Sequence, residues 1–158
     1  MGTYDNQRVL WRFQTPLYGG DLAKVNADVL YPGVYSGLGV TLSAGAVVNI
    51  AAGSMLIFDR ASYGTPGERK MVKISLLSQQ QLTCDSVNKP RFIVARFTWF
   101  GALDVGADIL NIAVPEASDV ILAAIEWNGA SISRIDLESA TKGFHDQFEA
   151  VVPADLSP

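Results

Sequence analysis

The chain has 158 residues, of which 49% are hydrophobic and 18% charged, and it carries a formal net charge of −4. This length is typical of a single domain with one hydrophobic core. The 12 basic residues are scattered except for one group around Arg69, so the sequence lacks the basic stripe that binding to a phosphate backbone requires. We therefore expect no nucleic-acid partner.

The low charge content has two explanations. An average soluble domain carries about 25% charged residues, whereas this chain carries 18%. Either a neighbouring protein covers part of the surface, or a compact β domain simply needs fewer charges. Composition alone leaves both explanations open.

Neither secretion nor membrane insertion is expected. The first residues, Met1–Asn6, lack the basic start and apolar run of a signal peptide. Cys84 is the only cysteine, which excludes an internal disulfide and fits synthesis in the cytosol. The uncharged stretch Val29–Phe58 is long enough for a membrane helix of about 20 residues. Its glycines, Pro32 and its alternating apolar residues instead predict strands and turns.

The N-terminal part contains one extended segment and one helix candidate. Arg8–Phe13 alternates polar with bulky apolar residues, which predicts a short strand or an extended arm, followed by a turn near Pro16. Asp21–Leu30 is predicted to be a short helix, because Asp21 can cap it and its apolar residues have helical spacing. Pro32 would end this helix.

From Gly37 onward the apolar residues alternate with a period of two, as in β-strands separated by glycine-rich turns. Strands are predicted at Val40–Leu42, Val48–Ile50, Met55–Phe58, Met71–Leu77, Leu82–Cys84, Arg91–Phe100, Ala107–Val114, Asp119–Trp127 and Ser131–Leu137. The apolar run Val120–Ile125 does not alternate and could also be a buried helix turn. Its β-branched residues and the hairpin turn predicted at Asn128–Gly129 favour a strand.

Arg91–Phe100 has the strongest strand pattern in the chain. Its side chains at Ile93, Ala95, Phe97 and Trp99 share one face, and that face is wholly apolar. We therefore expect these four residues in the core.

The fold class that follows is mostly β. Short connections without a strand–helix rhythm favour a single antiparallel β-sandwich or compact barrel of roughly eight strands. We expect residues 1–36 to form an N-terminal arm with a short helix, residues 37–138 the β-sandwich domain, and residues 139–158 an extended C-terminal tail.

No catalytic, cofactor-binding or metal-binding residue is predicted, and the chain is not expected to be an enzyme. The only histidine, His145, lies in the tail, and no nucleophile-elbow motif is present. Asp104, Asp108 and Glu116 could approach a cation, but scattered loop carboxylates are more often solvated.

The three tryptophans could form a platform that stacks against sugars. Trp99 is instead assigned to the core. Trp127, at the end of a buried strand, could belong either to the core or to such a platform. Trp11 lies between Leu10 and Arg12 in the arm. It fits an interface anchor, because Trp and Arg are enriched at the centres of protein interfaces.

Two glycine-containing runs carry a family resemblance: Leu30–Leu38 (LYPGVYSGL) and Val47–Ile57 (VVNIAAGSMLI). They resemble modules of tailed-bacteriophage tail and baseplate proteins, in which a similar PGV.SG turn leads into a similar strand pair. The strand at Arg91–Arg96 and the hairpin at Ile125–Ile132 also lie where the similar proteins carry theirs. The resemblance covers about residues 13–137.

Two departures from the family pattern bear on function. Ala52 stands where such modules usually have proline, and this chain ends at residue 158 where they often continue into a long fibre. The second departure favours an adaptor over a receptor-binding fibre.

The resemblance implies a virion structural protein, made in the host cytoplasm, that docks a fibre, spike or neighbouring ring to a phage tail or baseplate. Its partners would be other tail or baseplate proteins and copies of itself, with a homotrimer expected because fibres commonly attach through three-fold symmetry. The alternative function is a carbohydrate- or receptor-binding β-sandwich module. Candidate interface residues are Arg8, Trp11, Phe13, Tyr31, Tyr35, Phe144 and Phe148.

Overall fold

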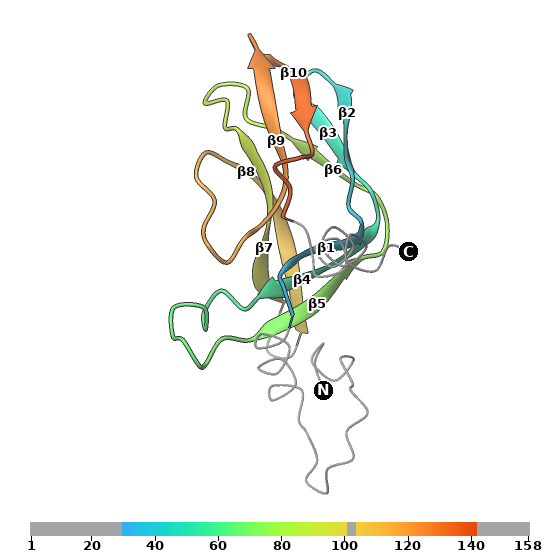
Figure 1. Cartoon of the computed structure of the whole chain (residues 1–158). Helices are drawn as coiled ribbons and strands as arrows, with labels where there is room; N and C mark the ends of the chain where they lie inside the picture. Colours follow the sequence, from blue (N-terminus) through green and yellow to red (C-terminus); the bar gives the residue numbers. More distant parts are fainter. Residues whose placement is uncertain (1–29, 101–103, 142–158) are drawn as a thin grey trace, which may run out of the picture.

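A computed structural model describes residues 30–100 and 104–141, and these residues form ten β-strands and no helix (Figure 1). The strands are β1 (Gly33–Gly37), β2 (Val40–Ala44), β3 (Val47–Ile50), β4 (Gly53–Phe58), β5 (Met71–Leu76), β6 (Gln80–Thr83), β7 (Phe92–Phe100), β8 (Asp104–Ile112), β9 (Val120–Asn128) and β10 (Ser131–Asp136). All pairings between them are antiparallel.

Six strands form one bent layer. The sheets β1-β4-β5 and β2-β3-β6 are continuous in sequence, because β1 runs into β2, β3 into β4, and β5 into β6. Backbone hydrogen bonds from Leu38 N to Ala52 O (3.3 Å) and from Ala51 N to Gly39 O (3.0 Å) carry the pairing across the bend. In Figure 1, β2 and β3 rise beside β10, whereas β1, β4 and β5 turn across the lower part of the molecule.

Two glycines make this bend sterically possible. A Cβ atom on Gly37 would lie 2.0 Å from the carbonyl oxygen of Ala52, and one on Gly53 would lie 2.1 Å from that of Ser36. Gly37 also has a φ of 61°, a conformation that glycine adopts at no steric cost. β1 and β4 can therefore pair this closely at Gly37 and Gly53 only because neither residue has a side chain.

The remaining four strands form a sheet with the order β10-β9-β7-β8. Gly129 and Ala130 make the turn between β9 and β10, one residue later than predicted, because Asn128 and Ser131 pair with each other as strand residues. Gly129 has a φ of 62°, as such turns require. The buried core lies between this sheet and the bent layer, with Ile57 and Val72 on one side and Ile93, Phe97 and Leu122 on the other.

Thr141 joins the two layers at their edge. Its amide donates to Ile121 O (2.8 Å), its carbonyl accepts from Val34 N (3.0 Å), and its hydroxyl accepts from Ile121 N (3.1 Å). Thr141 therefore bridges β1 and β9, which are not directly paired.

The mostly β, antiparallel fold is confirmed for the described residues. The described strands do not form a closed barrel, because they divide into three open sheets, each with an edge strand on both sides. The predicted helix over Asp21–Leu30 lies outside the described residues except for Leu30, which is not helical. The strand β1 was not predicted, because its glycines have the pattern of a turn.

One core assignment is wrong. Ile93, Ala95 and Phe97 are buried as expected, but Trp99 on the same face of β7 is 43% exposed. The alternation correctly gives the side of the sheet, whereas the facing layer does not extend far enough to cover Trp99.

Candidate functional site

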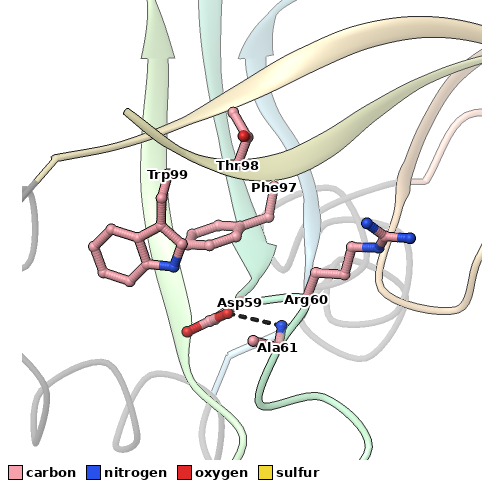
Figure 2. A pocket seen from close by; sticks show the side chains of 6 residues that line it. All are labelled: Asp59, Arg60, Ala61, Phe97, Thr98 and Trp99. Atoms are coloured by element: carbon pink, nitrogen blue, oxygen red, sulfur yellow. Dashed lines mark hydrogen bonds between the residues drawn. The ribbon is translucent and has the colours of Figure 1, made fainter. Parts of the chain in front are cut away.

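A pocket of about 420 Å³ opens where β4 ends and the last part of β7 crosses it (Figure 2). We call it the Asp59 pocket. It is lined by Asp59, Arg60, Ala61, Phe97, Thr98 and Trp99. None of these residues was a predicted site residue.

Asp59 forms the floor of the pocket. The turn after β4 fixes it, because its backbone N–H donates to Lys70 O (2.8 Å) and its Oδ1 accepts from Ala61 N (2.9 Å). The whole residue is only 6% exposed. Among the described residues, no group donates a hydrogen bond to its second oxygen, Oδ2, and no cation pairs with it. The carboxylate is thus buried and only half satisfied.

Two aromatic rings from β7 face this carboxylate. Phe97 and Trp99 lie on the same face of the strand, with ring centroids 5.6 Å apart and ring planes at 86°. Figure 2 shows both rings on the side of the pocket opposite Asp59. Phe97 is packed into the core, whereas Trp99 keeps part of its indole surface exposed.

The guanidinium of Arg60 pairs with Glu116 and not with Asp59. Its side chain points away from the aromatic pair (Figure 2) and donates to both carboxylate oxygens of Glu116, at 2.5 and 2.7 Å. The hydrogen bond and the attraction between the two charges raise the pKa of Arg60, and the hydrogen bond from Arg60 lowers the pKa of Glu116. Asp59 therefore contributes the only uncompensated charge among the residues that line the pocket.

A second ion pair fixes the neighbouring strands. Arg96 on β7 donates two hydrogen bonds to Asp119, and it also lies 3.5 Å from Glu116. The hydrogen bond to Asp119 raises the pKa of Arg96. Arg60, Glu116, Arg96 and Asp119 thus form one network, in which each charge has an opposite partner.

The predicted interface residues are only partly covered by the described structure. Arg8, Trp11, Phe13, Phe144 and Phe148 lie outside it. Tyr31 is 51% exposed just before β1, and the hydroxyl of Tyr35 donates to Tyr31 O at 3.0 Å. The structure therefore brings these two tyrosines together, at a place separate from the residues of the Asp59 pocket.

Trp127 and Cys84, which were also considered from the sequence, both have structural roles. The indole N–H of Trp127 donates to Pro90 O at 2.9 Å, which ties β9 to the segment before β7. Burial raises the pKa of the Cys84 thiol to about 11. Within residues 30–100 and 104–141, no group of three or more His, Cys, Asp or Glu side chains could hold a metal ion.

The edge strand β6 is a second feature that the sequence reasoning missed. In the described sheets β6 pairs only with β3, and three of its four residues are exposed. None of the three strands of this sheet, β2, β3 and β6, contains a charged residue. Leu77 and Val87, in the segments on either side of β6, are 91% and 85% exposed. The uncharged run from Leu76 to Cys84 was the signal that could have revealed this edge.

Comparison with known proteins identifies no relative: no protein-family model, curated protein or solved structure matches the chain. The described part also contains no helix long and apolar enough to cross a membrane.

Proposed function

We propose that this chain is a virion structural protein of a phage tail or baseplate, acting as an oligomeric adaptor that docks a fibre, spike or neighbouring ring. The observation that carries the proposal is the edge strand β6, which in the described part of the chain pairs on one side only, with β3. Natural proteins usually blunt such edges with charges, proline or a covering segment, because an open edge pairs with other chains. Within the described residues the β6 edge is short but carries neither a charge nor a proline, and three of its four residues are exposed, which suits a strand that is paired in an assembly.

The hydrogen-bonding direction along β6 defines the docking groups. Cys84 N donates to Ala46 O, which makes these two residues a hydrogen-bonded pair of the β3–β6 ladder. Since the direction alternates along an antiparallel strand, Leu82 also faces β3. The backbone groups of Gln81 and Thr83 therefore point away from β3, toward an incoming strand.

The occupant we propose is the Arg8–Phe13 segment of a neighbouring copy. Val9, Trp11 and Phe13 would share one apolar face of an added strand, whereas Arg8, Leu10 and Arg12 would share the other. Leu77 and Val87 provide exposed apolar surface near both ends of β6. Because β6 carries no charge, the arginines of this segment meet no like charge on it. Closing such contacts around a three-fold axis would give the trimer, and the two layers would then act as a β-sandwich platform.

Mass spectrometry of purified phage particles tests this function. We expect the chain as a stoichiometric component of the tail in a strain that produces the particle. Particles that are complete and infectious but lack the chain would contradict the proposal.

The alternative, a carbohydrate-binding module, is favoured by one observation. Trp99 is partly exposed beside the free oxygen of Asp59, and an aromatic face next to a hydrogen-bond acceptor is a common arrangement for sugars. Glycan-array binding by the full chain, abolished by Trp99→Ala, would establish this alternative in place of the adaptor.

A further inference from the structure

We propose that the Asp59 pocket binds the cationic end of a lysine or arginine side chain presented by a partner protein. The proposal concerns a site different from the β6 edge and goes beyond the proposed docking function. It rests on the state of Asp59, the aromatic pair and the charges around them.

The half-satisfied carboxylate is the first argument. Buried polar groups are nearly always hydrogen-bonded, and a buried charge is normally paired. Asp59 is 6% exposed, and only its Oδ1 accepts a hydrogen bond, from Ala61 N. A cationic N–H donor placed in the pocket would supply both the missing hydrogen bond and the missing opposite charge.

The aromatic pair is the second argument. Phe97 and Trp99 stand nearly perpendicular, at 86°, so together they offer an edge and a face around the space above Asp59 (Figure 2). A cation is attracted to an aromatic face, most strongly to that of tryptophan. The ring pair and the carboxylate therefore favour the same kind of group from two sides.

The surrounding charges decide between a cation and a neutral sugar. The guanidinium of Arg60 is held by Glu116 and that of Arg96 by Asp119, so neither is available to Asp59. A sugar hydroxyl would hydrogen-bond to Oδ2 but would leave the negative charge uncompensated. A cation removes both deficits, and a pocket of about 420 Å³ has room for the end of a long basic side chain.

Titration of the full chain with small probes tests the site. The probes are N-acetyl-lysine methylamide, N-acetyl-arginine methylamide, the neutral N-acetyl-norleucine methylamide and a set of methyl glycosides. The readout is the indole N–H signal of Trp99 in nitrogen-15 spectra, assigned with Trp99→Phe. We expect saturable shifts with the two cationic probes and none with the neutral probe or the glycosides.

Matched variants locate the interaction. Asp59→Asn keeps the acceptor for Ala61 N but removes the charge, and it should weaken binding of both cations by about tenfold. Asp108→Asn changes an exposed carboxylate on β8 that does not line the pocket, and it should leave the affinity unchanged. If Asp59→Asn does not fold, Trp99→Leu, at a partly exposed position, should give a comparable loss, measured through the backbone N–H signal of Ala61 because this variant lacks the indole reporter.

Four results would overturn the proposal: no shift with either cation, equal binding of the norleucine probe, tighter binding of a methyl glycoside, or unchanged affinity in the variants. The first, second and fourth results leave the adaptor function standing, since that function is tested on particles and through β6, whereas tighter binding of a methyl glycoside would favour the carbohydrate-binding alternative.

Discussion

Arg96 on β7 and Asp119, immediately before β9, are joined by two parallel hydrogen bonds, from Nε to Oδ1 at 3.0 Å and from Nη2 to Oδ2 at 2.9 Å. The Asp119 side chain is fully buried, whereas that of Arg96 is 20% exposed. Asp119 also accepts from Glu116 N at 2.8 Å, so one carboxylate fixes both the loop before β9 and the strand next to it. The pair therefore holds the strand that carries Phe97 and Trp99.

Removing the carboxylate of Asp119 should destabilise the fold strongly. Asp119→Ala leaves Glu116 N without its acceptor and Arg96 with only its 3.5 Å contact to Glu116, and breaking a buried ion pair in this way costs about 3–5 kcal/mol. Urea unfolding measures the loss. The control is Glu126→Gln, which breaks the exposed pair with Arg134 and should change stability by less than about 0.5 kcal/mol. Equal losses of unfolding free energy for the two substitutions would show that the Asp119 pair stabilises the fold no more than an exposed ion pair does.

Phe97 and Trp99 should differ in their contributions to stability. Phe97→Ala creates a cavity in the core and should cost about 3–5 kcal/mol. Trp99→Ala should cost clearly less, because 43% of the tryptophan is already exposed. Melting curves of the two variants decide the order. An unchanged melting temperature for Phe97→Ala would mean that the faces of β7 are inverted.

Acid should destabilise the folded chain through Asp85 and Glu116. The Asp85 carboxylate accepts hydrogen bonds from Asn88 N, Asn88 Nδ2 and Val87 N, and these lower its pKa below the ordinary 3.8. The pKa of Glu116 is lowered by its hydrogen bond to Arg60. A carboxylate with a lowered folded-state pKa stabilises the fold fully above its ordinary pKa, and this stability is lost as pH falls through the folded-state value.

The free energy of unfolding should therefore be steady near neutral pH and should decline below about pH 4. Asp85→Asn should make this decline shallower, because one of the titrating groups is gone. Denaturant titrations across this range provide the measurement. A decline of equal slope in the variant would exclude Asp85 as a source of acid sensitivity.

The end of the described structure predicts where the C-terminal tail can be removed. Truncation after Thr141 retains the three hydrogen bonds that bridge β1 and β9, and the fold should remain stable. Truncation after Ala140 removes all three and should lower the stability by about 1–3 kcal/mol. Hydrogen exchange at Val34 N and Ile121 N would report the difference directly. Equal protection of both amides in the two truncated chains would disprove the bridge.

Several strands that follow Gly37, such as β2 and β7, could be predicted because their residues alternate, a pattern that depends only on local geometry, whereas the continuous apolar run of β9 was assigned from its β-branched residues and the turn that follows it. Trp99 shows the limit of that reasoning, since alternation gives a side of the sheet but not the extent of the layer opposite. Asp59 was not predicted for a related reason. Its turn has a local signature, an aspartate whose side chain accepts from the amide two residues on, but its aromatic partners come from a strand far along the chain.

The mass of the full chain in solution is the most direct test of the claim that it assembles through β6. Light scattering should give about three times the 17.0 kDa of one chain. Gln81→Pro should give the mass of a single chain that is still folded, because the lost N–H points away from β3 and proline is tolerated at strand edges. Leu82→Pro, the control, should instead unfold the sheet, since its N–H is used in pairing with β3. A wild-type chain that stays at 17.0 kDa at high concentration, or a Gln81→Pro variant that still forms the trimer, would contradict the account.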